Sequence, residues 1–587
     1  MKFIRPTLAF LLSINMSVAV LAAAKTDYPI TIVGGNEASF TPSVKSKKPI
    51  VDSAKYDVII VGGGLAGLSS AVYLSDEKKK VLLLEKEADF GGLAAKGMTS
   101  DGIRFDRGAA YWTAPYEEEL QIFKRIGLGN FEKHAIPEPI DSYLTIQKKS
   151  KAPDEHKLYR GIWDEGLHDL PISFSIFKYE LLQANKDKLI PDQPFEEFAN
   201  PELDKLTAVQ WINQMPAKFK FRNDAEAQEL QKRFADEIKS KKISKENPMK
   251  EVVEFLHLFC RSALGSTCNN VSALVFANFY ISEISTRYSS DVGTAKAAEN
   301  MVEILKDEER QPYVNLLTKA AVGKISKDKK SAKYTVSYLK DGAVHQAKAP
   351  YVVFAAQLKL APKFIEGFNA QNKSAKVRKQ VAAIQKLKYA HYSIHVATVK
   401  GHPYRDTYDT WVRASDYSEN DFSDVILAYW MNPEIDAYKD FKDFKSHPKE
   451  PENSLITIYH PHPASAVKNG KGFTDADAKA MAKKAVARVV ELFNPFLKKN
   501  WNTEFEILSV QTNRWPYSAH IANPGHFTKS AKLMRNPFGN IFFAHNNMGT
   551  PALEEALFRG HCAAINVLHR MDPSFTRETW SKCPMEN

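Results

Sequence analysis

The sequence predicts an α/β protein in which a Rossmann-like dinucleotide-binding domain is interleaved with a second domain, made of a mixed sheet and helices. Residues 56–85 follow the order strand, glycine turn, helix and strand, which is the βαβ unit of that fold. Buried-strand patterns recur at 351–356 and 540–544, as expected for a parallel sheet that distant segments complete. Residues 120–300 show mainly helical periodicity, which is typical of a large insertion.

The N-terminus has the three parts of a secretory signal peptide. Lys2 and Arg5 precede an apolar stretch at 8–21, and Ala22-Ala23-Ala24 forms the small-residue site after which we expect cleavage. An uncleaved anchor is the alternative, although polar residues interrupt the apolar stretch. We therefore expect an exported protein, periplasmic or secreted, with no membrane span in the mature chain. Residues 25–55 are polar and predict a mobile leader.

The composition is that of a large folded protein. With 44% hydrophobic and 25% charged residues in 587, it excludes collagen-like, disordered and low-complexity chains. The formal net charge of +11 comes without any nucleic-acid reader motif, so we expect no nucleic-acid partner. The 4 cysteines are too few for a disulfide scaffold, and their spacing does not decide whether they pair.

A glycine-rich turn joins the first predicted strand to the first helix. The strand at 57–61 leads into Gly62-Gly63-Gly64-Leu65-Ala66-Gly67, then a helix at 68–74 and a second strand at 81–84 that ends at Glu85. In such a turn Gly62 allows the tight bend, Gly64 lets a pyrophosphate approach the backbone, and Gly67 lets helix and strand pack closely. The helix N-terminus favours phosphate, and Glu85 can accept hydrogen bonds from ribose hydroxyls.

Two further blocks, at 85–92 and 105–112, resemble the N-terminal signature of the flavin amine oxidase superfamily. That superfamily includes monoamine and polyamine oxidases, L-amino-acid oxidases, protoporphyrinogen oxidases and phytoene-type desaturases. The resemblance implies FAD as the cofactor, bound by a Rossmann-like FAD-binding domain of the GR2 type. It implies that Gly91-Gly92 lines the pyrophosphate and that Gly108-Ala109 lies against the flavin ring. The arginine that usually follows the second glycine pair is Leu93 here, so that phosphate contact is in question.

The middle and C-terminal blocks extend the resemblance. Residues 313–356 resemble the part of the FAD domain in which a valine backbone meets the adenine, which implies that role for Val322. The strand at 540–544 and the helix at 550–568 resemble the last FAD-binding elements, with the helix N-terminus near Leu553 facing the flavin N1 and O2 edge. The implied cofactor contacts are Gly62, Gly64, Leu65, Ala66, Gly67, Glu85, Lys86, Gly91, Gly92, Leu93, Gly108, Ala109, Ala110, Tyr111, Val322, Asn546, Ala552 and Leu553.

These blocks divide the chain into alternating parts of two domains. The predicted parts are a signal peptide (1–24), a polar leader (25–55), three FAD-binding parts (56–120, 301–365 and 510–570), a mainly helical substrate-domain insertion (121–300), a substrate-domain sheet with helices (366–509) and a C-terminal tail (571–587).

Several positions depart from the family pattern. His545-Asn546 stands where Gly-Glu is common, and Asn546 can still hydrogen-bond the ribityl chain. Ala552 stands where monoamine oxidases have an aromatic cage residue, and the lysine that holds a water near N5 has no clear counterpart. These departures weaken the case for a simple monoamine oxidase. They leave the oxidoreductase reaction class in place and the substrate open.

The sequence assigns no catalytic residue, but it offers three pocket candidates. His520 is a flavin-linkage site, a substrate contact or a loop histidine, while Tyr429 and Trp411 either line the pocket or belong to the core. The alternating histidines at 460–462, with two more on another strand, leave open a polar strand face or a metal site, and we predict no metal.

The predicted function is that of an FAD-dependent oxidoreductase acting on a small molecule. It takes a hydride from a C–N bond of an amine or amino acid to flavin N5, and oxygen or another acceptor reoxidises the flavin. One alternative is a desaturase or isomerase of an apolar substrate. Another is a flavin-binding protein without turnover.

Overall fold

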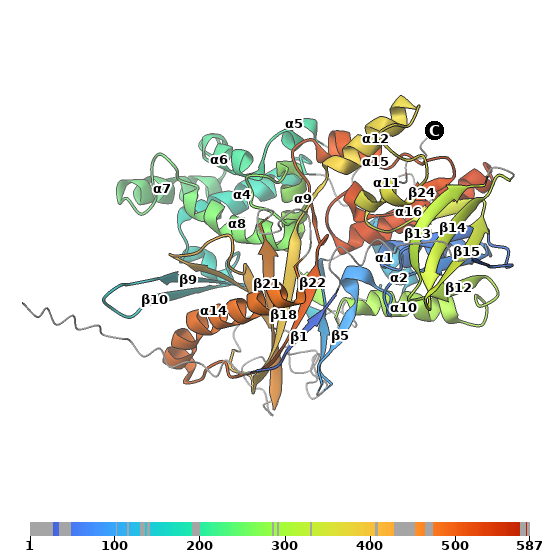
Figure 1. The fold of residues 1–587 in the computed structure, drawn as a ribbon. Helices are drawn as coiled ribbons and strands as arrows, with labels where there is room; N and C mark the ends of the chain where they lie inside the picture. Colours follow the sequence, from blue (N-terminus) through green and yellow to red (C-terminus); the bar gives the residue numbers. More distant parts are fainter. Residues whose placement is uncertain are drawn as a thin grey trace, which may run out of the picture.

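The computed structural model describes residues 28–34, 49–100, 102–113, 117–129, 136–137, 141–190, 200–284, 287–289, 293–328, 331–404, 409–427, 452–463, 473–575 and 583. Figure 1 shows two regions side by side. The region at the right holds α1, α16 and the β13–β15 sheet, and the region at the centre and left holds a long sheet with α14 and a group of helices.

A five-stranded parallel sheet forms the centre of the first region, which we call the cofactor region. Its strands, in spatial order, are β12 (Val314–Leu317), β4 (Val81–Leu84), β3 (Val58–Val61), β16 (Tyr351–Phe354) and β24 (Ile541–Phe543). Every pairing between them is parallel. The inner strands are buried on both faces, which explains why they are continuous apolar runs rather than alternating ones.

Different elements cover the two faces of this sheet. One face packs against the helices α1 (Leu65–Asp76), α2 (Glu117–Arg125), α10 (Ala295–Lys306) and α16 (Leu553–Met571). The other face packs against the sheet of β13 (Ala321–Lys327), β14 (Tyr334–Lys340), β15 (Ala343–Ala349) and β2 (Ile50–Val51). This layered arrangement confirms the predicted Rossmann-like domain.

An eight-stranded mixed sheet forms the second region, which we call the substrate-facing region. Its spatial order is β1 (Ile30–Val33), β22 (Ile507–Trp515), β18 (His391–Lys400), β21 (Asn453–His462), β20 (Asp424–Leu427), β19 (Asp409–Ala414), β9 (Ser142–Gln147) and β10 (Glu155–Arg160). The helix α14 (Asp475–Trp501) packs along β1, β18 and β22. The predicted mixed sheet is therefore present, and β9 and β10 join it from the mainly helical insertion.

The helical insertion forms its own apolar core against the β9–β19 side of this sheet. It consists of α4 (Ile172–Lys186), α5 (Pro201–Asp204), α6 (Ala208–Phe219), α7 (Ala225–Lys239), α8 (Lys250–Leu264) and α9 (Ala273–Glu283). These helices account for much of the helical periodicity that the sequence shows over residues 120–300. No helix in the described part of the chain is long and apolar enough to cross a membrane.

Several shorter elements complete the fold. They are β5 (Lys96–Met98) with β6 (Arg104–Asp106), β7 (Trp112–Thr113) with β11 (Arg287–Ser289) and β8 (Ile136–Pro137), β17 (Lys388–Tyr389) with β23 (His520–Ile521), and the helices α11 (Ala361–Phe364), α12 (Ala375–Lys386) and α15 (Lys532–Met534).

The predicted mobile leader is wrong for two of its segments. Ile30–Val33 forms β1, which pairs in parallel with β22 at the edge of the substrate-facing sheet. Ile50–Val51 forms β2, which pairs with β15 in the cofactor region. The apolar run at 30–33 supplies the side chains that pack, and the exposed edges of two sheets supply the hydrogen-bonding partners. The leader is thus attached to both regions.

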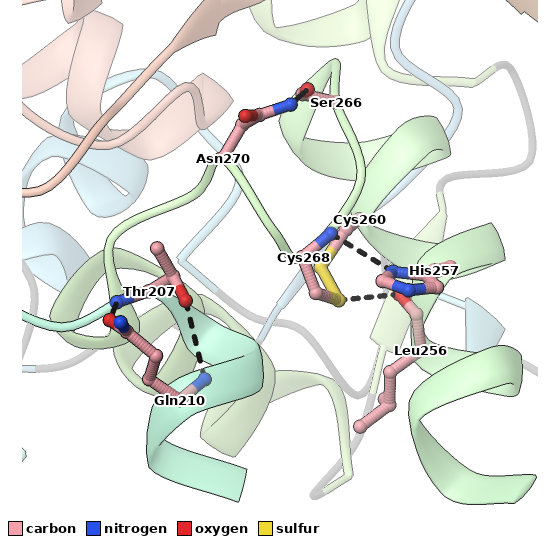
Figure 2. Close-up of a disulfide and its surroundings, with 8 residues drawn as sticks. All are labelled: Thr207, Gln210, Leu256, His257, Cys260, Ser266, Cys268 and Asn270. Atoms are coloured by element: carbon pink, nitrogen blue, oxygen red, sulfur yellow. Dashed lines mark hydrogen bonds between the residues drawn. A yellow bond between two sulfur atoms is a disulfide. The ribbon is translucent and has the colours of Figure 1, made fainter. Parts of the chain in front are cut away.

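All four cysteines are paired. Cys260 bonds to Cys268 at the end of α8, and Cys562 on α16 bonds to Cys583. Figure 2 shows the first disulfide, where the Cys268 N–H donates to His257 Nδ1 at 3.2 Å. In the same view the side chains of Thr207 and Gln210 form a capping box at the start of α6.

Candidate active site

A cavity of about 290 Å³ lies where the carboxyl ends of β3 and β4 meet the N-termini of α1 and α16. Fourteen of the predicted cofactor contacts line it: Gly62, Gly64, Leu65, Ala66, Glu85, Lys86, Gly91, Gly92, Leu93, Ala109, Val322, Asn546, Ala552 and Leu553. Gly67 does not line this cavity. Gly108, Ala110 and Tyr111 line a second cavity beside it.

The glycines of the first turn have distinct structural roles. Gly62 has φ of +109°, and a Cβ there would lie 2.9 Å from the Ala355 backbone. A Cβ on Gly67 would lie 1.9 Å from the Gly62 carbonyl oxygen, so this glycine permits close packing of helix and strand. Gly64 faces the cavity, and the nearest atom to a Cβ there is Gly92 Cα at 3.9 Å. The open backbone at Gly64 therefore fits the close approach of a diphosphate.

Glu85 is held rigidly at the edge of the cavity. Its carboxylate accepts the Gly63 N–H at 2.7 Å and the Glu87 N–H at 2.8 Å. Burial raises the pKa of Glu85, while these two backbone hydrogen bonds act in the opposite direction. A fixed carboxylate at the end of the second strand suits a ribose, as the sequence predicted.

The N-terminus of α16 lies between the two cavities. Ala552 and Leu553 line both of them, as do Pro551 and Asn546. Ala552 offers no side-chain cap, so the first backbone N–H groups of the helix are available to a ligand that gains negative charge. The Asn546 side-chain amide donates to the Ala552 carbonyl at 3.3 Å and so holds this helix start in place.

The segment Gly108-Ala109 is fixed from both regions. The Tyr459 hydroxyl, on β21, donates to the Gly108 carbonyl at 2.6 Å. The Thr294 hydroxyl donates to the Ala109 carbonyl at 2.7 Å, and the Thr294 N–H donates to Asp106 at 3.0 Å. Burial raises the pKa of Asp106 to about 8. A planar ligand that lies against this segment therefore meets a wall that cannot easily move.

The second cavity, of about 130 Å³, opens beyond the helix N-terminus toward the substrate-facing sheet. Aromatic side chains make up much of its wall: Tyr111, Trp112, Phe279, Tyr392 and Tyr459. Its floor is a row across three neighbouring strands, because Ile394 pairs with Tyr459 and Tyr459 pairs with Asp424.

Asp424 places a carboxylate on this largely apolar floor. It is 1% exposed, and the Ser423 hydroxyl donates to it. Burial lowers the pKa of Arg261, whereas the negative charge of Asp424 raises it. The two charged side chains therefore interact. Arg261 donates to three backbone carbonyls and does not line the cavity. No local sequence pattern singles out Asp424, because its position depends on the register of three strands.

The structure corrects two of the three pocket candidates. Trp411 pairs with Asp424 but lies one strand farther out, where its ring contacts Phe255 and Phe259 at 6.0 and 5.8 Å, so the core alternative is correct. His520 lines neither cavity, and its Nε2 lies 3.0 Å from the Gly549 carbonyl. Burial lowers the pKa of His520 to about 4. Tyr429 lies outside the described residues.

The alternating histidines form a hydrogen-bonded chain inside the substrate-facing sheet. His460 Nε2 lies 2.9 Å from the Asn420 carbonyl, which can only accept, so Nδ1 of His460 accepts from His395 Nε2 at 3.2 Å. His395 Nδ1 then accepts the Thr512 hydroxyl at 3.0 Å. Burial lowers the pKa of both histidines. Within the described ranges, no group of three or more His, Cys, Asp or Glu is arranged to hold a metal ion.

Comparisons with known proteins agree with this geometry. The chain is 45% identical over 92 residues to a carotenoid 3,4-desaturase of Haloarcula japonica, covering 16% of each chain. It is 26% identical over 173 residues to the flavin-containing amine oxidase A of Canis lupus familiaris, covering 29% of this chain and 30% of the relative. The curated relatives are matched over only 15% to 33% of their own lengths.

The fold is shared over a much longer stretch. Cyclohexylamine oxidase from Brevibacterium oxydans IH-35A has a similar structure, with a TM-score of 0.56 and 14% sequence identity, covering 88% of this chain and 100% of that one. The sequence model of the flavin-containing amine oxidoreductase family matches residues 65–568. That match covers most of both regions and most of the residues that line the two cavities, and so the chain belongs to the flavin-containing amine oxidoreductase family, with FAD as its cofactor.

Proposed function

We propose that the protein oxidises a small cationic amine at the carbon next to nitrogen, in the second cavity. The observation that carries the proposal is the buried carboxylate of Asp424 on an aromatic floor. A carboxylate in the wall of an aromatic cavity can form a charge-assisted hydrogen bond with a protonated amine.

FAD supplies the chemistry of the reaction, because the flavin accepts a hydride from carbon. The residues of this chain do the rest. The aromatic wall excludes water from the substrate. Asp424 binds the ammonium group and accepts the proton that the nitrogen releases as the hydride leaves the neighbouring carbon. The N-terminus of α16 stabilises the negative charge that the flavin gains on reduction, because its free N–H groups carry partial positive charge.

The test is anaerobic reduction of the flavin, followed by its visible absorbance, since this readout does not depend on the electron acceptor. We expect a panel of primary and secondary amines to contain members that bleach the flavin band. Asp424→Asn should weaken binding of those amines about tenfold to a hundredfold, with unchanged FAD content, because a charge-assisted contact is lost. Asp421→Asn is the matched control, since Asp421 precedes the same strand but does not line the cavity.

Three outcomes would contradict the proposal in different ways. Reduction by polyenes and by no amine would indicate a desaturase. Reduction by no compound, with FAD bound, would indicate a flavin-binding protein without turnover. Equal amine affinity of the Asp424→Asn variant and the native protein would show that Asp424 takes no part in substrate recognition.

We also propose that the protein is exported. The signal-peptide pattern at 1–24 supports this, as do the two disulfides, which persist in oxidising compartments. Cell fractionation and N-terminal sequencing of the mature protein test it: a cytoplasmic protein that retains its N-terminus would overturn the proposal.

A further inference from the structure

Three cations line the cofactor cavity, and two of them are already engaged by the protein. Lys86 forms an ion pair with Glu87. The terminal nitrogens of Arg514 donate to the carbonyls of Gly34 and Phe473, each at 2.7 Å. Arg514 also forms an ion pair with Asp475. The third cation is Arg107.

Arg107 has no ion-pair partner among the residues that the structure describes. Its Nε donates to Asn513 Oδ1 at 3.3 Å, and its guanidinium carbon lies 5.6 Å from the centre of the Trp515 ring. The Trp515 indole N–H in turn donates to the Arg107 carbonyl at 2.6 Å, so ring and backbone hold each other. The guanidinium is thus supported by polar and aromatic contacts without being neutralised.

Burial lowers the pKa of Arg107, while Glu87 and Asp89 act in the opposite direction. A partly desolvated guanidinium gains more from a bound anion than an exposed one does. Arg107 lines the cofactor cavity and not the second cavity. The anion it suits is therefore part of the cofactor rather than of the substrate.

The backbone places Arg107 beside Leu93, the position at which the sequence lacks a phosphate-binding arginine. The Arg107 N–H donates to the Ala95 carbonyl at 3.1 Å, and the Ala109 N–H donates to the Leu93 carbonyl at 2.9 Å. Residues 107–109 therefore run alongside residues 93–95, and both Leu93 and Arg107 line the cavity. Neighbours of this kind on paired segments lie about 7–8 Å apart, which the long arginine side chain can span.

We propose that Arg107 binds the diphosphate of FAD and supplies the positive charge that Leu93 does not. The planar guanidinium can donate two parallel hydrogen bonds to phosphate oxygens, and the Trp515 ring keeps its plane in position. The positive charge therefore stands on the segment 107–109 instead of the paired segment 93–95, and it faces the same cavity.

The experiment measures ligand affinity of the apo-protein, so it does not depend on the reaction catalysed. FAD binding is followed by flavin fluorescence, and ADP and adenosine are measured as competitors. Arg107→Gln should weaken FAD and ADP about tenfold to a hundredfold, because a charge-assisted contact is lost, and leave adenosine unchanged. Arg104→Gln is the matched control: Arg104 lies on the same hairpin, pairs with Glu299 and does not line the cavity, so FAD affinity should stay native.

A second pair of variants keeps the proposal testable if Arg107→Gln folds poorly. Arg107→Lys retains the charge and should bind ADP within a few-fold of the native protein. Leu93→Arg, added to Arg107→Gln, should restore most of the lost affinity for FAD. Native affinity in Arg107→Gln, or equal losses for adenosine and ADP, would overturn the proposal, and so would a failure of Leu93→Arg to rescue a folded Arg107→Gln protein.

Discussion

The two cavities meet at the N-terminus of α16, yet they are built differently. Backbone forms much of the cofactor cavity: glycines at 62, 64, 91 and 92 and the unpaired start of a helix. Side chains from three neighbouring strands and from helices form the second cavity. A cavity wall made of backbone is specified by a few glycines, and its binding groups do not depend on the neighbouring side chains. A wall of side chains can change its ligand by single substitutions, and so the cofactor is easier to assign than the substrate.

The sharpest test of this contrast compares two glycines of one turn. Gly67→Ala should lower the free energy of unfolding by about 3 kcal/mol or more, because its Cβ would lie 1.9 Å from the Gly62 carbonyl. Gly64→Ala should change the stability of the apo-protein by less than about 1 kcal/mol and still weaken FAD binding, because its Cβ enters the cavity. Thermal unfolding and FAD titration measure both effects. Equal loss of stability in the two variants would mean that the cavity does not depend on open backbone at Gly64.

Removing each disulfide compares the two regions directly. The Cys562–Cys583 bond, in the cofactor region, closes a separation of 21 residues, and Cys260–Cys268, in the helical insertion, closes one of 8. By loop entropy the first should contribute about 3 kcal/mol and the second slightly less. Denaturant unfolding of the two double Cys→Ser variants measures this. A much larger loss for the shorter loop would show that the insertion, and not α16, limits stability.

Acid should weaken the substrate-facing sheet through its histidine chain. Burial lowers the pKa of His460 to about 4, so the folded state keeps it neutral while the unfolded chain binds a proton below pH 6.5. The contribution of His460 to the free energy of unfolding is therefore complete above pH 6.5 and is lost as the pH falls toward 4. One such histidine lowers the free energy of unfolding by about 2 kcal/mol as the pH falls from 6.5 to 5. His460→Gln should flatten the dependence of unfolding free energy on pH, and an unchanged slope would contradict this.

The smallest expected effect lies at the helix cap shown in Figure 2. Thr207→Ala removes the side chain that accepts the Gln210 N–H and should cost about 1 kcal/mol of stability. Because Thr207 lines neither cavity, FAD and amine binding should stay native. A change in either affinity would indicate that the insertion transmits its stability to the site.

Local patterns explain what the sequence predicts well. The strand, glycine turn and helix at 58–76 are specified by neighbouring residues, and they appear as expected. Asp424 could not be found this way, because only strand register brings it beside Tyr459. Trp411 illustrates the same limit, because it lies on the strand next to Asp424 and there belongs to the core rather than to the cavity wall. The pairing of β1 depends on a partner far along the chain, which no local pattern in the leader reveals.

The leader also affects when the cofactor site can close. Gly34 lines the cofactor cavity and accepts a hydrogen bond from Arg514, 480 residues away in the sequence. The contact between Gly34 and Arg514 forms only after β22 has been synthesised and has folded, and contacts of such high sequence separation form slowly. During folding, the turn at Gly62–Gly67 can therefore exist while this side of the cavity is still open. FAD bound in this cavity would contact both segments, and so its binding energy would also stabilise the contact between the leader and β22.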